Sequence, residues 1–92
     1  MAQMITDSII TIVMLVNQSV PPVPADIEVV QSYGTERLVF EDETGATKHE
    51  AGECMLLRAH PTQFKSWLDG REIWTSMAPM TGSWVRRTVA PL

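Results

Sequence analysis

Residues 8–17 read SIITIVMLVN, and this stretch decides the fold class of the chain. The run is short for a helix and rich in β-branched residues, which favours a β-strand over a helix. Its apolar residues follow one another without alternation, as they do in strands that are buried on both faces. We therefore predict that these residues form the central strand of a sheet.

The remainder of the chain also has the pattern of short strands separated by turns. Six Ile, nine Val and nine Thr gather in runs that Gly, Pro, Asn and Asp interrupt. Further strands are expected at residues 27–32, 37–41, 47–51, 54–59, 73–77 and 84–89. Between them, residues 42–45 (DETG) are typical of a hairpin turn, Gly52 of a turn or bulge, and the last two strands of a terminal hairpin.

Two segments depart from the strand pattern. The sequence Pro21-Pro22-Val23-Pro24 forbids a helix or a central strand and predicts an extended connector. In residues 61–69, Phe64, Trp67 and Leu68 recur at helical spacing before a glycine stop, and His60 is placed to cap the helix.

These elements predict one domain that spans residues 1–92. We expect a mainly β fold, a small β-barrel or β-sandwich of about six or seven short strands with one short helix at about residues 61–69. Residues 1–25 are expected to form an extended arm, or the central strand followed by the Pro-rich connector.

Composition excludes several broad classes. With 45% hydrophobic and 20% charged residues and a mean hydropathy of zero, the chain is too apolar for disorder and too polar for a membrane protein. Cys54 is the only cysteine, so no internal disulfide is possible and a reducing compartment is favoured. The apolar run that begins near Ile9 has no basic residue before it, which argues against a signal peptide.

The charge divides unevenly along the chain, with a net value of −4. Residues 1–53 hold nine acids against two bases, and residues 54–92 hold five bases against two acids. This asymmetry favours either pairing between the halves within one sheet or head-to-tail contact between copies. The candidate acidic contact surface consists of Glu36, Glu41, Asp42, Glu43, Glu50 and Glu53.

No residue pattern indicates catalysis, a cofactor or a metal. His49, Cys54 and His60 are the conventional soft-metal ligands, and they lack zinc-site spacing. The chain has no glycine-rich phosphate loop, nucleophile elbow or metalloprotease motif. We predict a protein that is not an enzyme and that has no catalytic, cofactor-binding or metal-binding residues.

Three Trp and six Met in so short a chain point to a contact surface, because Trp and Arg anchor interfaces and Met adapts to irregular pockets. Trp67 is expected in the core, on the helix. Strand alternation places Arg86 on the face of Trp84 and Arg87 on the opposite face. The candidate interface residues are Trp74, Met77, Met80, Trp84, Arg86 and Arg87.

In compactness, β-richness and acidity the chain resembles small virion proteins of tailed bacteriophages, of the capsid decoration or cement type. The resemblance includes no motif and assigns no residue. It implies a structural protein without catalysis that stabilises an assembly through protein contacts, either as a capsid decoration protein or as a head-tail or tail accessory protein. Its partners would be a repeated protein surface or copies of itself, and its location the virion or the host cytoplasm.

Two other functions remain open from the residues. A small acidic phage-encoded inhibitor would place its carboxylates in the basic groove of a host nucleic-acid-binding defence complex. A β-barrel that binds single-stranded nucleic acid would stack bases on Trp74 or Trp84, although a pI of about 4.9 argues against nucleic acid as a partner. A membrane partner is not expected.

Overall fold

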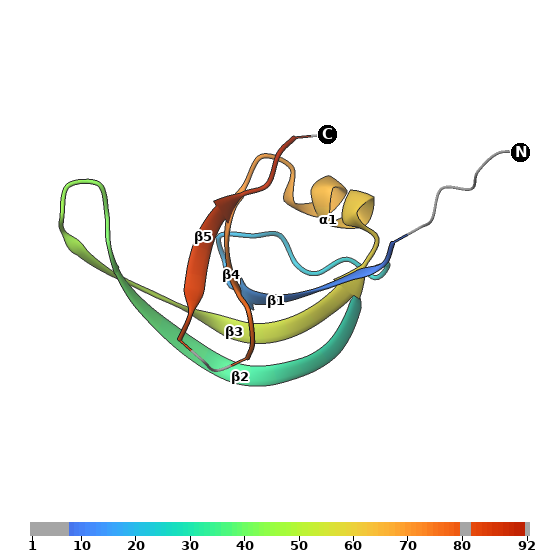
Figure 1. Ribbon diagram of the computed structural model, residues 1–92, viewed down its shortest axis with the longest axis horizontal. Helices are drawn as coiled ribbons and strands as arrows, with labels where there is room; N and C mark the ends of the chain where they lie inside the picture. The colour runs from blue at the N-terminus through green and yellow to red at the C-terminus, as the bar shows by residue number, and fades with distance from the viewer. Residues whose placement is uncertain (1–7, 80–81, 92) are drawn as a thin grey trace, which may run out of the picture.

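The chain folds as one five-stranded antiparallel sheet with a single helix against it, as the computed structural model shows for residues 8–79 and 82–91 (Figure 1). The order of the strands in the sheet is β2-β3-β1-β4-β5. The helix follows the third strand in the chain. The elements are β1 (Ile10–Val16), β2 (Glu28–Glu41), β3 (Thr47–Ala59), α1 (Pro61–Leu68), β4 (Glu72–Ser76) and β5 (Trp84–Thr88).

β1 is the central strand, as residues 8–17 predict. It pairs with β3 along its whole length and with β4 at Val13 and Met14. Met14 is fully buried in the main core, while its neighbours Val13 and Leu15, which point to the other face, are 7% and 2% exposed. Burial on both faces explains why the sequence of this strand is almost continuously apolar.

The structure has five strands instead of six or seven because two pairs of expected strands are continuous. Residues 27–32 and 37–41 fall mostly within β2, and residues 47–51 and 54–59 are both part of β3. At Gly34, φ is +86°, and the register between β2 and β3 shifts between Ser32 and Thr35. A β-bulge at this position accommodates the left-handed conformation of Gly34, so the strand continues past it. Gly52 is no turn either, since it pairs with Glu36 inside the ladder.

β2 and β3 form a long, curved hairpin whose far end reaches away from the body of the domain (Figure 1). We call its outer half, residues 36–52, the arm, which is a different segment from the extended arm expected at residues 1–25. The turn at its tip is the one expected at residues 42–45. The Asp42 carboxylate accepts hydrogen bonds from the backbone N–H groups of Thr44 (2.9 Å) and Ala46 (3.0 Å), and Gly45 takes a φ of +83°. The pKa of Asp42 lies below its ordinary value, chiefly because the Thr44 hydroxyl also donates to it.

α1 begins at a capping box. The Nδ1 atom of His60 accepts from the Thr62 N–H at 3.2 Å, and the Gln63 side chain accepts from the His60 N–H at 2.7 Å. This confirms that His60 caps the helix. The helix buries Phe64, Trp67 and Leu68 against the sheet, as their spacing predicts.

The main core lies between α1, the sheet and the connector that precedes β2. The connector has no regular secondary structure over residues 21–24, as its prolines predict. Trp67 Nε1 donates to the Pro21 carbonyl at 3.0 Å, which ties the connector to the helix. The buried residues of this core are Met14, Val20, Ile27, Leu57, Ala59, Phe64, Trp67, Leu68 and Ile73. Within the described residues, no helix is long and apolar enough to cross a membrane.

Candidate functional site

The β4–β5 hairpin carries most of the predicted interface residues and divides them between its two faces. The pairs Ile73–Arg87 and Thr75–Val85 belong to one face, and the pairs Trp74–Arg86 and Ser76–Trp84 to the other. The two arginines therefore lie on opposite faces, as their alternation predicts. Met80 lies outside the described residues. The predicted interface is thus two separate sites.

The first site is an apolar groove between α1, β1 and the hairpin, which we call the helix–hairpin groove. It encloses about 720 Å³. It adjoins the short β1–β4 contact, where β4 pairs with β1 at two positions only. Residues that line it include Ile12, Phe64, Leu68, Ile73, Met77 and Val85.

The rim of the helix–hairpin groove combines exposed apolar side chains with two cations. Met77 is 90% exposed and Val85 48% exposed. Lys65 of α1 and Arg87 of β5 also line the groove, and Arg87 is oriented by a hydrogen bond from its Nε to the Thr75 hydroxyl (3.1 Å). No acidic residue of the described chain lines the groove. Exposed apolar side chains that line the same groove mark a binding surface more often than scattered ones do.

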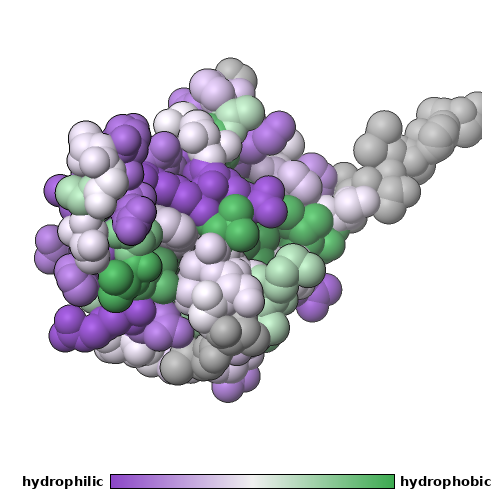
Figure 2. Space-filling view, turned by 60° about the vertical axis from the view of Figure 1, so that its left-hand side comes forward, coloured by the Kyte–Doolittle hydropathy of each residue, from purple (hydrophilic) through white to green (hydrophobic). Residues whose placement is uncertain are grey.

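The surface next to the hairpin is mixed in character. Figure 2 shows hydrophobic side chains in separate patches with hydrophilic ones between them.

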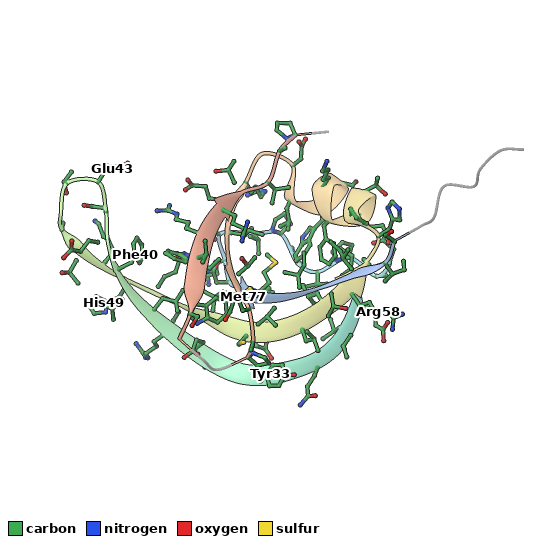
Figure 3. The ribbon with its side chains drawn as sticks, in the orientation of Figure 1. Tyr33, Phe40, Glu43, His49, Arg58 and Met77 are labelled. Atoms are coloured by element: carbon green, nitrogen blue, oxygen red, sulfur yellow. The ribbon has the colours of Figure 1, made fainter. Side chains whose placement is uncertain are left out.

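The second site is an aromatic cluster on the opposite face of the hairpin, formed by Phe40, Trp74 and Arg86. The two ring centroids are 5.0 Å apart, and the Arg86 guanidinium lies 5.6 Å from the Phe40 centroid and 5.8 Å from that of Trp74. Arg86 also forms an ion pair of 2.6 Å with Glu72. Figure 3 shows Phe40 on the arm, beside β5. The cluster therefore brings both edge strands of the sheet together.

Trp74 and Trp84 differ in how their indole N–H groups are satisfied. Trp74 Nε1 donates to both carboxylate oxygens of Glu50, at 3.1 and 3.3 Å. Trp84 Nε1 is buried and has no hydrogen-bond partner within the described part of the chain. A small pocket of about 230 Å³ lies beside it, lined by Phe40, Trp74 and Trp84 together with residues 36–39 and Gly82.

The six acidic residues proposed as a contact surface do not share one environment. Glu50 is bound to Trp74, Glu53 accepts from the Ser32 hydroxyl, and Asp42 is held in its turn, 3.8 Å from Lys48. Glu41 and Glu43 are exposed near the tip of the arm, where Figure 3 labels Glu43. The ion pairs Lys48–Asp42 and Arg86–Glu72 each join residues of the same half of the sequence.

The soft-metal ligands are not brought together by the fold. Cys54 is buried in β3, His49 is exposed on the arm, and His60 caps α1. Among the described residues, no group of three or more His, Cys, Asp or Glu side chains is arranged to hold a metal ion.

The sequence did not reveal which other residues of the chain contact the predicted interface residues. Phe40 and Glu50 contact Trp74 across the sheet, and α1 supplies one wall of the helix–hairpin groove. Phe40 lies two residues after Leu38 in the expected strand 37–41, so the two side chains share a face. No local pattern reveals that this face contacts a strand more than thirty residues away.

No protein-family model, curated protein or solved structure matches this chain.

Proposed function

We propose that this chain is an interaction protein without catalysis that docks on a protein partner through the helix–hairpin groove. The exposure of Met77, at 90%, carries this proposal. Within this class, our specific candidate is a small phage virion component, either a capsid decoration protein or a head-tail or tail accessory protein, that binds a repeated assembly surface or copies of itself.

The expected attachment is largely apolar. Covering a Met or Val side chain contributes about 1.5–3 kcal/mol of transfer free energy, so Met77 and Val85 together account for an appreciable part of a docking energy. Lys65 and Arg87 at the rim favour a partner segment with acidic residues beside its apolar ones. Binding of this kind stabilises the assembly by an amount that grows with the logarithm of the free protein concentration relative to its Kd.

The test is a tagged pull-down from cells that produce the protein in its native context, washed at low and then at high salt and read by mass spectrometry. We expect a shell or tail protein to remain bound to the natural chain through high salt. Met77→Asp places a charge at the groove and should lose that partner. Val39→Asp is the matched control, because Val39 is an apolar strand residue that is 66% exposed on the arm, outside the lining of the groove.

Thermal unfolding must first show that both variants fold. Unchanged capture by Met77→Asp, or equal loss with Val39→Asp, would contradict docking through the groove.

The exposed carboxylates of Glu41 and Glu43 near the tip of the arm support a second candidate, the acidic inhibitor of a host nucleic-acid-binding defence complex. The same pull-down separates the two. Capture of a nucleic-acid enzyme that high salt releases, and that Glu41→Lys with Glu43→Lys abolishes, would favour the inhibitor.

A further inference from the structure

The two edges of β1 are paired to very different extents. On one side, every residue of Ile10–Val16 pairs with β3. On the other side, β4 pairs with Val13 and Met14 alone. In Figure 1, the N-terminal half of β1 extends beyond β4, toward the side of the molecule that carries α1. Residues 10–12 therefore have a neighbouring strand on one side only.

The β1–β4 ladder stops where the chain turns out of the sheet. The register of this ladder, continued by one residue, would place Met77 opposite Ile12. The chain bends there instead: the Ser76 hydroxyl donates to the Ala78 carbonyl at 2.8 Å, and Met77 is 90% exposed. Since β4 ends at Ser76, it leaves the edge of β1 uncovered from Ile12 back to the start of the strand.

This uncovered edge carries backbone hydrogen-bonding groups. In an antiparallel ladder, alternate residues of a strand direct their N–H and C=O groups away from the partner strand. Among the described residues, Ile10, Thr11 and Ile12 make no backbone hydrogen bond outside the strand ladders, and β4 does not pair with them. The edge is thus open to the ladder of an added strand.

The helix–hairpin groove runs along this edge. Four consecutive residues, Ile10–Val13, line it, although their side chains alternate between the two faces of β1. A groove that touched one face of the strand would be lined by every second residue only. Its walls include Phe64 and Leu68 of α1 and Val85 of the hairpin. A segment in the groove therefore meets apolar walls and open backbone groups together.

The charges beside the groove indicate which side chains the segment carries. Lys65 and Arg87 line the groove, and neither forms an ion pair within the described chain. A strand with apolar residues on one face and carboxylates on the other would contact both the walls and the cations.

A second copy of the chain fits the groove less well than a partner of that kind. The edge strands that a copy could offer are β2 and β5. β5 carries Arg86 and Arg87, which would meet like charge at the groove. β2 shifts register twice between Val29 and Thr35, and such shifts interrupt a regular ladder.

We propose that the partner segment in the helix–hairpin groove binds as a β-strand, which pairs with the open edge of β1 at residues 10–12 and carries apolar residues alternating with Asp or Glu. This mode of binding rests on the proposed function, because it specifies how the docked partner is held. When a strand is added to a sheet edge, backbone hydrogen bonds supply affinity and the contacts of alternate side chains supply specificity.

The test uses the full chain labelled with ¹⁵N and an acetylated, amidated heptapeptide of alternating Val and Glu as the probe. Amide hydrogen exchange is measured by NMR with and without saturating peptide. We expect exchange to slow about tenfold or more at those amides of residues 10–12 that face away from β3, and to stay unchanged in the arm.

Two N-methylated forms of the peptide are matched controls, one methylated at its Val residues and the other at its Glu residues. Successive residues of a strand direct their N–H groups to opposite edges, so only one of the two sets faces β1 when the Val side chains face the apolar walls. One form should therefore bind at least about tenfold more weakly than the other, because it loses several hydrogen bonds.

A charge reversal on the protein tests the acidic character of the segment. Lys65 is exposed on α1 and lines the groove, so Lys65→Glu should weaken peptide binding about threefold or more. Lys48→Glu is the matched control, because Lys48 is exposed on the arm, outside the lining of the groove. Equal effects of the two reversals would overturn the choice of an acidic segment.

Unchanged exchange at residues 10–12 in the presence of bound peptide, or equal binding by the two methylated forms, would overturn strand pairing. Decanoate, an alkyl carboxylate without backbone groups, would also overturn it by shifting the signals of the groove when the peptide does not. Slowing of exchange with protein concentration alone would assign the edge to a second copy and overturn the choice of a partner protein.

Failure of strand pairing and failure of the proposed function give different results. Capture of a partner that Met77→Asp abolishes, with unchanged exchange at residues 10–12 in the presence of the peptide, would support docking in the groove and overturn strand pairing. Slowed exchange with the peptide, with capture of a partner that Met77→Asp leaves intact, would contradict the proposed function and support the strand site.

Discussion

Replacement of Gly52 by alanine tests how closely β1 and β3 approach. A Cβ atom at Gly52 would lie 2.8 Å from the Val16 carbonyl oxygen, 2.9 Å from Asn17 Cβ and 2.9 Å from Leu15 Cγ. Contacts this short with a backbone atom require the end of β1 to move. β1 is the central strand and Leu15 is 2% exposed, so that movement disturbs packed residues.

Overpacking of this kind destabilises by about 1–3 kcal/mol. In a domain of this size each kcal/mol lowers the melting temperature by about 4–8 °C, so Gly52→Ala should melt roughly 5–20 °C lower. Urea unfolding should show the same loss as a lower midpoint with an unchanged slope. Calorimetry and circular dichroism both measure the effect.

Ala51→Val is the matched control, because Ala51 is the exposed neighbour on the opposite face of the same strand. It should change stability by no more than about 0.5 kcal/mol. A Gly52→Ala variant as stable as the natural chain would refute the close approach of the strands, and equal losses in the two variants would show a general sensitivity of β3.

Three further predictions concern side-chain hydrogen bonds. The Thr44 hydroxyl lowers the pKa of Asp42 below its ordinary 3.8, so this hydrogen bond stabilises the turn above pH 3.8 and the contribution is lost as the pH falls through the lowered pKa. Thr44→Val should therefore raise the midpoint of Asp42 in a carboxyl ¹³C NMR titration. An unchanged midpoint would contradict this. Glu50→Ala leaves the indole N–H of Trp74 without its acceptor, so the free energy of unfolding measured in urea should fall by about 1–3 kcal/mol. Glu50→Gln retains an acceptor and should lower it less. Equal losses in the two variants would argue against the hydrogen bond. Gln63→Ala removes half of the capping box and should lower the free energy of unfolding by about 1 kcal/mol in thermal melts, and no change would show that the cap contributes little.

The elements with strong local patterns were predictable from the sequence. The central strand, α1 with its His60 cap, the turn at Asp42 and the terminal hairpin all follow from spacing, capping and turn chemistry. The number of strands was not predictable from the sequence, because glycine occurs both in turns, which end a strand, and in bulges, which do not. Gly34 lies in a bulge and Gly52 in a ladder, and the distinction depends on a neighbouring strand that local sequence does not specify.

The candidate site was predictable in composition but not in arrangement. Strand alternation correctly separated Arg86 from Arg87. It could not show that Phe40 and Glu50 meet Trp74, because that contact depends on how the sheet bends. Nor could the sequence show that Trp84 lacks an acceptor, since this depends on the tertiary positions of all its neighbours.

The central place of β1 sets the order of events when the chain is made on a ribosome. β1 precedes both of its partners in the sequence, and β3 ends at Ala59 while β4 begins at Glu72. The most apolar strand therefore emerges before its partners and stays unpaired until Glu53, which pairs with Val16, has been made. During that interval it is a natural ligand for a chaperone, and slow translation should favour aggregation of the nascent chain.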